Sequence, residues 1–205
     1  MKAIFYDWGG ANAWLFYLIN GFHSPWWDRF MLAGTALSAH SNFPLYVATV
    51  ALAGVIATGL RKKPRPREAS LGWLSAVCVF AWSYVVVGLL VAALKAGLDL
   101  PRPPLALPPG SVHIVGAPEY RHSFPSGHSA FAMTVAASLW PVLRRGWKIL
   151  AVLFVAWVGL SRVSLGVHFP ADVVGSYALA LLTVVAVRFL VTRLSATLGG
   201  KMANP

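Results

Sequence analysis

Long stretches without a charged side chain dominate the chain and alternate with short polar connections. Residues 43–60 and 72–94 carry no charge at all. Three further apolar runs, at 129–143, 147–166 and 171–191, are shorter or have a charge near one end. A helix needs about 20 mostly apolar residues to cross the hydrocarbon core of a bilayer. The pattern therefore predicts an all-α, polytopic membrane helix bundle with five spanning helices.

The N-terminal part of the chain has a weaker pattern. Its apolar segments at 11–20 and 31–37 are short for a spanning helix. We therefore expect a sixth, N-terminal helix that either lies at the membrane interface or crosses the membrane. The opening residues lack the long apolar core of a cleavable signal peptide, so we expect no processing. The expected division is a single domain, 1–205, with an N-terminal helical segment 1–42, core helices 43–194 and a cytoplasmic tail 195–205.

Composition supports a membrane protein and argues against a soluble domain, a nucleic-acid-binding protein and a disulfide-bonded domain. Hydrophobic residues make up 58% of the chain and charged residues only 11%, whereas soluble domains carry about 25% charged residues. The net charge of +11 comes from basic residues between apolar runs rather than on a polar surface, which argues against a nucleic-acid-binding protein. The single cysteine, Cys78, excludes an internal disulfide framework.

The positions of the basic residues predict the orientation. They gather in segments 61–68 and 144–148 and towards the C-terminus, at Arg188, Arg193 and Lys201. If the five helices alternate in direction, all of these lie on one side, which the positive-inside rule makes cytoplasmic. Connections 97–126 and 164–170 then lie on the outer side. We expect a multi-pass protein of the cytoplasmic (inner) membrane with its active site facing the periplasm or the outside.

The outer ends of the helices carry polar groups suited to binding an anion. Charges within membrane helices are costly and call for a functional or interfacial explanation. Ser126 is a good N-cap before an apolar helix, and Gly127 lets a ligand approach the free N–H groups of the helix start. His128 at that position can donate a proton to an oxygen of a bound group. An ordinary capped helix start would have the same local sequence.

A second cluster surrounds the last two helices. Arg162 lies near the outer end of one helix, His168 in the connection, and Asp172 in the first turn of the next helix. A carboxylate four residues after a histidine, across a short bend, can accept one ring N–H, which leaves the other ring nitrogen as a better nucleophile. Taken alone, such a pair is more often structural than catalytic.

Together these residues resemble the signature of the type 2 phosphatidic acid phosphatases. The three parts are Lys-x6-Arg-Pro at 95–103, Pro-Ser-Gly-His at 125–128, and Ser-Arg-x5-His-x3-Asp at 161–172. Every fixed spacing within each part matches. The membrane phosphatases of that family have a core of six helices, so the resemblance implies a multi-helix membrane enzyme that acts on a lipid phosphate.

The resemblance also implies residue roles. His168 would attack phosphorus and form a phosphohistidine, Asp172 would orient His168, and His128 would protonate the leaving oxygen. The phosphoryl oxygens would be held by Lys95, Arg102, Ser126, Gly127 and Arg162. No cofactor or metal is implied, and the sequence has no paired-histidine zinc motif or carboxylate cluster.

Substrate identity remains open within this class. The compact form resembles both the undecaprenyl diphosphate phosphatases and the small phosphatidylglycerol phosphate phosphatases of that family. We favour undecaprenyl diphosphate, and the alternatives are phosphatidylglycerol phosphate, phosphatidic acid and lipid A. A lipid phosphotransferase, a vanadium-dependent haloperoxidase and a non-catalytic lipid transporter are more distant possibilities. The expected partners are the lipid phosphate and the bilayer, with no nucleic acid. Within connection 97–126, Arg121 and His122 are candidate headgroup contacts, whereas His23 and His40 lie outside the motifs and are interpreted as polar surface residues.

Overall fold

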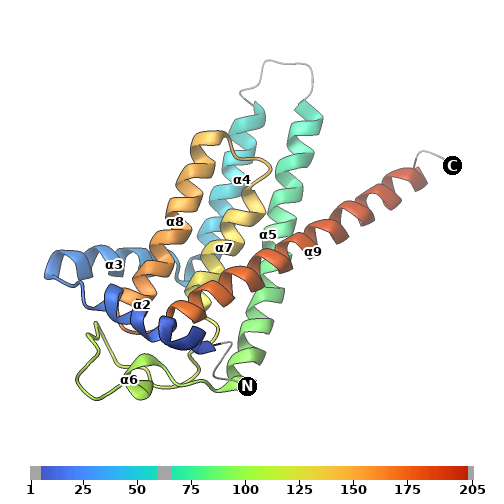
Figure 1. Ribbon diagram of the computed structural model, residues 1–205. Coiled ribbons are helices and arrows are strands. Elements are labelled where there is room, and N and C mark those ends of the chain that lie inside the picture. Colours follow the sequence, from blue (N-terminus) through green and yellow to red (C-terminus); the bar gives the residue numbers. More distant parts are fainter. Residues whose placement is uncertain (1–5, 60–65, 203–205) are drawn as a thin grey trace.

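The protein is all-helical in the computed structural model, which describes residues 6–59 and 66–202 (Figure 1). Long helices form a bundle, and shorter helices and an irregular connection cover one end of it. The elements in chain order are η1 Trp8–Gly10, α2 Ala11–Asn20, α3 Pro25–Leu37, η2 His40–Asn42, α4 Phe43–Gly59, α5 Pro66–Leu98, α6 Pro103–Ala106, α7 Gly127–Leu139, α8 Arg145–Ser164 and α9 Pro170–Met202.

Within the described residues, four helical segments are long and apolar enough to cross a membrane. They are His40–Gly59, Leu71–Ala106, Arg145–Ser164 and Pro170–Ser195. Large apolar side chains such as Leu52, Leu89 and Leu182 are exposed on their outer faces, as lipid contact requires. The predicted fold class, a polytopic bundle of helices, is confirmed.

Helix α7 differs from the fifth span expected at 129–143. It has 13 residues, a length of about 20 Å at 1.5 Å per residue, and ends at Leu139. It packs against α5, α8 and α9, and most of its side chains are buried. Its apolar composition therefore reflects burial against other helices rather than contact with lipid along its whole length.

Arg188 of α9 helps to terminate this inner helix. Its Nη2 group donates hydrogen bonds to the carbonyl oxygens of Ala137 and Ser138, at 2.6 and 3.1 Å. The last carbonyl groups of a helix have no partner within the helix, and a cation at this end also matches the helix dipole. Arg188, expected only as part of the basic C-terminal region, thus fixes α7 to α9.

The N-terminal helices lie across the bundle rather than along it (Figure 1). Helix α2 packs on α8 and α9, and α3 packs on α8. With 10 and 13 residues, they have lengths of about 15 and 20 Å, shorter than a bilayer core of about 30 Å. Of the two alternatives for the N-terminal segment, the structure favours a position beside the ends of the spanning helices.

The two sets of connections lie at opposite ends of the bundle. Residues 99–126 and 165–169 lie at the end covered by α2, whereas residues 140–144 lie at the other end, near the end of α4 and the start of α5 (Figure 1). This arrangement agrees with the predicted alternation of the helices. Most of the basic segment 61–68 lies outside the described residues.

Candidate active site

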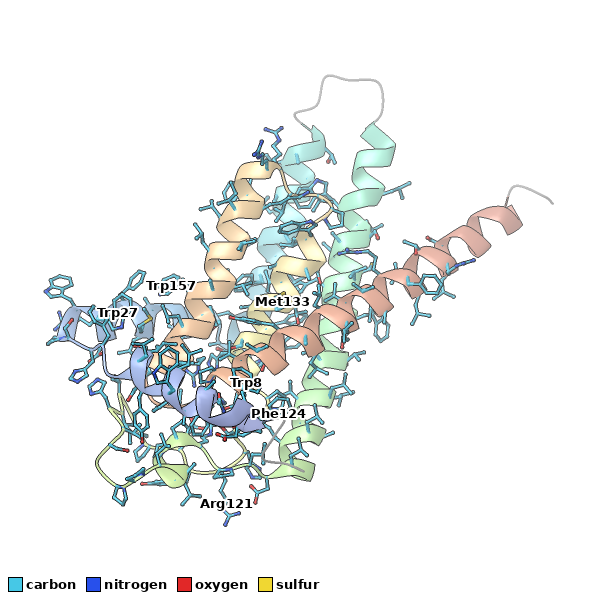
Figure 2. All side chains as sticks on the ribbon, viewed as in Figure 1. Trp8, Trp27, Arg121, Phe124, Met133 and Trp157 are labelled. Carbon is cyan, nitrogen blue, oxygen red and sulfur yellow. The ribbon has the colours of Figure 1, made fainter. Side chains whose placement is uncertain are left out.

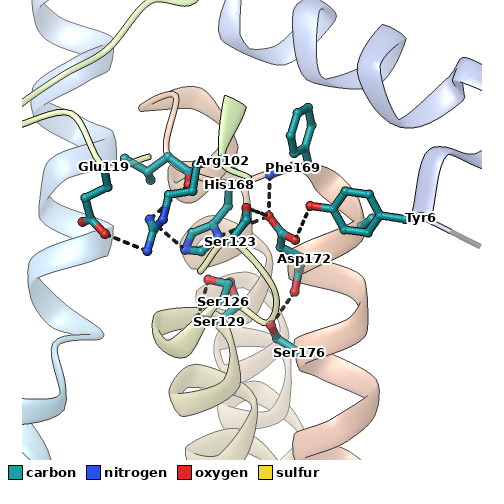
Figure 3. Close-up of polar contacts among 12 residues, drawn as sticks. Tyr6, Arg102, Glu119, Ser123, Ser126, Ser129, His168, Phe169, Asp172 and Ser176 are labelled. Atoms are coloured by element: carbon teal, nitrogen blue, oxygen red, sulfur yellow. Dashed lines mark hydrogen bonds and ion pairs between the residues drawn. The ribbon is translucent and has the colours of Figure 1, made fainter. Parts of the chain in front are cut away.

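His168 and Asp172 form a buried pair between α8 and α9 (Figure 3). His168 lies in the connection between the two helices, and Asp172 lies in the first turn of α9. The Nδ1 atom of His168 lies 3.2 Å from Oδ2 of Asp172, and both side chains are almost completely buried. The carboxylate accepts the Nδ1 proton, so Nε2 carries a free lone pair.

Asp172 is held by three further donors. The backbone N–H of Phe169 donates to Oδ2 at 2.8 Å, and the hydroxyl of Ser123 donates to the same oxygen at 2.5 Å. The hydroxyl of Tyr6 donates to Oδ1 at 2.7 Å. Because all of these groups donate, Asp172 acts as an ionised acceptor with a fixed orientation.

Arg102 lies on the other side of the His168 ring. Its Nη1 atom is 3.5 Å from Nε2 of His168 and donates to the carbonyl of Val167 at 3.2 Å. Its Nε group donates to the carbonyl of Arg121 at 2.9 Å. Nη2 forms an ion pair with Glu119 at 2.6 Å, and the Arg102 side chain is only 5% exposed. The guanidinium is therefore fixed beside the nitrogen that is free to attack.

Arg162 reaches the site from the end of α8. Its Nη1 group donates to the hydroxyl of Thr35 on α3, at 3.0 Å. Its Nε atom is buried and has no hydrogen-bond partner among the described residues. A buried donor without a partner is costly. An anion bound next to Arg162 would remove that cost.

The start of α7 completes the site. The hydroxyl of Ser126 accepts hydrogen bonds from the N–H and hydroxyl of Ser129, at 3.5 and 3.0 Å. The N–H of Ser126 donates to the carbonyl of Asp172 at 3.4 Å, which joins this helix start to the His–Asp pair. A helix N-terminus favours anions because its first N–H groups lack partners within the helix. Gly127 and His128 lie in the first turn of this helix, and their predicted roles at a phosphoryl group stay predictions.

These groups come from all three parts of the predicted signature, and they meet at one end of the bundle. A comparison with protein families gives a match to the PAP2 superfamily over residues 75–195. The chain belongs to the PAP2 superfamily. The resemblance inferred from the sequence is confirmed.

Two curated proteins are similar to parts of this chain. The Lipid A 1-phosphatase of Rhizobium johnstonii is 31% identical over 131 residues, which cover 58% of this chain and 49% of that protein. Phosphatidylglycerophosphatase B of Bacillus subtilis is 38% identical over 104 residues, which cover 46% of this chain and 47% of that protein. The matched parts thus span about half the length of these relatives.

Solved PAP2 structures have the same fold. The crystal structure of LpxE from Aquifex aeolicus gives a TM-score of 0.68 at 26% identity, covering 86% of this chain and 94% of that chain. The PAP2 type phosphatidylglycerolphosphate phosphatase of Bacillus subtilis gives 0.66 at 25% identity, covering 92% and 86%. A multi-pass membrane protein is therefore established, while its orientation stays a prediction.

Burial controls the protonation of the PAP2 site. It lowers the pKa of His168 to about 4, although the hydrogen bond and charge of Asp172 act in the opposite direction. Arg162 and Arg102 lower the pKa of His168 further. His168 is therefore neutral near pH 7, which is the protonation state that its predicted role as a nucleophile needs. Burial, followed by the charge of Asp172, raises the pKa of the Tyr6 hydroxyl, so Tyr6 remains a donor.

The remaining predicted contacts lie around the end of α5. Lys95, in the last turn of α5, lies within electrostatic range of Arg102 and Arg162. Arg121 points away from the bundle (Figure 2) and pairs with Asp99 at 2.5 Å. His122 lies 2.9 Å from the carbonyl of Lys95 and 3.2 Å from Asp99. The Arg121 carbonyl also accepts a hydrogen bond from Nε of Arg102, so both residues lie beside the site, and their role as headgroup contacts stays a prediction.

The described residues include no group of three histidine, cysteine, aspartate or glutamate side chains placed to hold a metal ion. The positive groups of the site are the protein's own, on Lys95, Arg102 and Arg162. Metal-independent chemistry remains a prediction that a chelator can test.

Sequence reasoning missed several polar side chains that contact the site. Tyr6 and Thr35 belong to the N-terminal segment, which carries no motif, and no spacing rule connects them to α8 or α9. Ser123 lies just before the second motif, and this proximity was the one available signal. His40, interpreted from sequence as a surface residue, is exposed but has its ring 5.9 Å from that of His128.

Proposed function

We propose that this protein is a lipid phosphatase that works through a phosphohistidine on His168. The observation that carries the proposal is the position of Nε2. Asp172 accepts the proton on Nδ1 at 3.2 Å, and Arg102 stands 3.5 Å from Nε2. The nucleophilic nitrogen thus faces a cation that would hold the phosphoryl group under attack.

The reaction then proceeds in two displacements. In the first, Nε2 of His168 forms a bond to phosphorus while the bond from phosphorus to the lipid oxygen breaks. His128 donates a proton to that oxygen, and the lipid alcohol leaves. In the second, His128 removes a proton from water, whose oxygen attacks phosphorus as the bond to Nε2 breaks. Inorganic phosphate leaves and His168 is regenerated.

Charge stabilisation comes from groups that are already fixed. As the transition state forms, negative charge spreads over the phosphoryl oxygens. Arg102 and Arg162 offer planar donors that match two oxygens each, Lys95 adds a point charge, and the start of α7 offers backbone N–H groups. The Nε atom of Arg162 is buried and has no hydrogen-bond partner among the described residues. This supports a role for Arg162 in phosphate binding, because a phosphoryl oxygen would supply the missing acceptor.

The position of the site next to the membrane favours a lipid phosphate as the substrate. The site lies at the ends of the candidate spans, where a tail can stay in the bilayer while the phosphate enters. The relatives, a Lipid A 1-phosphatase and phosphatidylglycerol phosphate phosphatases among them, support phosphatidylglycerol phosphate and the 1-phosphate of lipid A more than undecaprenyl diphosphate. We infer that phosphatidylglycerol phosphate is the preferred substrate, since the most identical of these relatives is a phosphatidylglycerophosphatase. By the positive-inside rule, the site faces the outside of the cytoplasmic membrane.

Phosphate release by the full-length protein in detergent tests this proposal. The panel contains phosphatidylglycerol phosphate, lipid A, phosphatidic acid and undecaprenyl diphosphate, with His168→Ala as the inactive control. We expect the highest kcat/KM on phosphatidylglycerol phosphate. A clear preference for lipid A or the diphosphate would reassign the substrate, and release that persists in His168→Ala would refute the mechanism.

A further inference from the structure

His40 stands beside the leaving-group side of the site, although it belongs to none of the three motifs. It begins η2, the short turn between α3 and α4. Its ring centroid lies 5.9 Å from that of His128. Its Nε2 atom lies only 2.8 Å from the point where a Cβ at position 127 would stand. A Cβ at position 127 would meet the His40 ring, so a larger residue there would require that ring to shift.

The His40 ring is held by aromatic neighbours rather than by hydrogen bonds. It lies edge-on to Phe131 at 5.7 Å and tilted to Tyr84 at 6.2 Å. The Tyr84 hydroxyl donates to the His40 carbonyl at 3.5 Å. Neither ring nitrogen of His40 has a hydrogen-bond partner among the described residues, so both can bind a ligand.

The geometry of phosphoryl transfer indicates which part of the substrate would lie beside His40. The attacking and leaving atoms lie roughly in line on opposite sides of phosphorus. His168 attacks, so the general acid, His128, marks the leaving side. The His40 ring lies 5.9 Å from the ring of His128, whereas the polar groups next to the His168 ring are Asp172 at 3.2 Å and Arg102 at 3.5 Å. His40 therefore lies next to the departing alcohol.

We propose that His40 is a specificity-determining residue that hydrogen-bonds a hydroxyl group on the leaving alcohol of the substrate. This inference rests on the proposed lipid phosphatase function. In phosphatidylglycerol phosphate, the leaving glycerol carries a free hydroxyl on the carbon next to the one that bears the scissile phosphate. In phosphatidic acid, the same position carries an acyl ester, which has no O–H to donate. An imidazole at this place would favour the first lipid over the second.

The test compares His40→Ala with the wild-type protein on these two lipids in the same detergent. We expect kcat/KM on phosphatidylglycerol phosphate to fall about fivefold to tenfold, the effect of one neutral hydrogen bond, and on phosphatidic acid by less than about twofold. His40→Gln, which keeps a hydrogen-bonding group, should restore part of the preference. His23→Ala is the matched control, because His23 is also an exposed N-terminal histidine but stacks on His113 at 4.0 Å.

Each outcome separates this inference from the function on which it rests. A wild-type protein that releases phosphate from neither lipid would refute the proposed function, and the His40 proposal with it. If the wild type is active and His40→Ala loses activity on both lipids equally, the inference is overturned. His40 would then assist catalysis through His128 without distinguishing the two leaving alcohols. No change in the ratio of the two kcat/KM values would also overturn the inference. Thermal unfolding of each variant shows whether a general loss comes from misfolding.

Discussion

The contact between Tyr6 and Asp172 gives the sharpest test of the N-terminal segment. Tyr6→Phe removes one hydroxyl and leaves the aromatic ring in place. That hydroxyl donates to Oδ1 of Asp172 at 2.7 Å, while the other three donors of Asp172 are directed to Oδ2. The variant therefore leaves one oxygen of a buried carboxylate without its protein donor. A hydrogen bond to a charged group contributes about 1.5–3 kcal/mol, so we expect the free energy of unfolding to fall by about 2 kcal/mol.

The same change should slow the chemical step. Asp172 orients His168, and a carboxylate held at only one oxygen orients it less well. If about 1.4 kcal/mol of the lost interaction appears in the transition state, kcat falls about tenfold. KM should change by less than about twofold, because the Tyr6 hydroxyl donates to Asp172 and has no hydrogen bond to a predicted phosphate-binding residue among the described residues. With one donor fewer, Asp172 presents more negative charge to His168. The pKa of His168 then rises from about 4, and the acid limb of kcat/KM moves to higher pH.

Phosphate release at saturating lipid phosphate, measured below the unfolding temperature, checks this expectation. Tyr17→Phe is the matched control, because the Tyr17 hydroxyl lies 3.2 Å from the hydroxyl of Ser111 at an exposed site. The reasoning is refuted if Tyr6→Phe is less stable but keeps the wild-type kcat and acid limb. Equal losses in both tyrosine variants would also show that the Asp172 contact has no special role.

Three further expectations follow from the site. His168→Ala should lower phosphate release by roughly a thousandfold or more, since the nucleophile is gone, and a denaturing alkaline quench should trap a labelled phosphoprotein from the wild type alone; a labelled variant would assign the nucleophile elsewhere. In ¹⁵N spectra of histidine-labelled protein, the His168 signal, identified by its loss in His168→Ala, should titrate near pH 4, because burial disfavours the cation; titration near 6.5 would show that this site is more hydrated. A chelator should leave kcat unchanged, because the cations of the site are side chains; loss of activity that added metal restores would contradict metal independence. Vanadate, which mimics phosphate, should compete with the lipid phosphate.

Hydropathy predicted the bundle but not the role of every helix in it. Residues 72–94 and 43–60 were recognised because lipid contact requires an apolar surface along the whole helix. The run at 129–143 gave the same signal for a different reason. Its helix, α7, is surrounded by α5, α8 and α9, and a helix buried in protein is as apolar as one that faces lipid. Sequence alone does not distinguish these two environments. The run at 129–143 was therefore predicted to be a lipid-facing span, whereas its helix ends at Leu139 and is mostly buried in protein.

The reactive core of the site was predictable because it is encoded locally. His168 and Asp172 are four residues apart across one bend, and Ser126 caps the helix that begins with Gly127. Residues at such short spacings stay close together through the local backbone, so a pattern within one segment can reveal them. The comparison with the PAP2 superfamily confirms the family that these spacings indicated.

The supporting contacts could not be read in this way. Tyr6 and Asp172 are 166 positions apart, and Thr35 and Arg162 are 127 apart. No periodicity or spacing rule links residues at such separations, because only the docking of the N-terminal helices on α8 and α9 brings them together. The proposed role of His40 could not be predicted from sequence for the same reason. It depends on the close approach of the His40 ring to Gly127, which only the folded structure shows.

The sequence by itself determined the membrane class, the long helices and the residues of the three motifs, since hydropathy and short-range spacing act within single segments. The tertiary structure decided which apolar helix is enclosed by the others and how Arg102 meets the free nitrogen of His168. It also decided that the N-terminal segment supports Asp172 and Arg162. These features depend on packing between distant segments, and packing is a property of the assembled bundle rather than of any one stretch of chain.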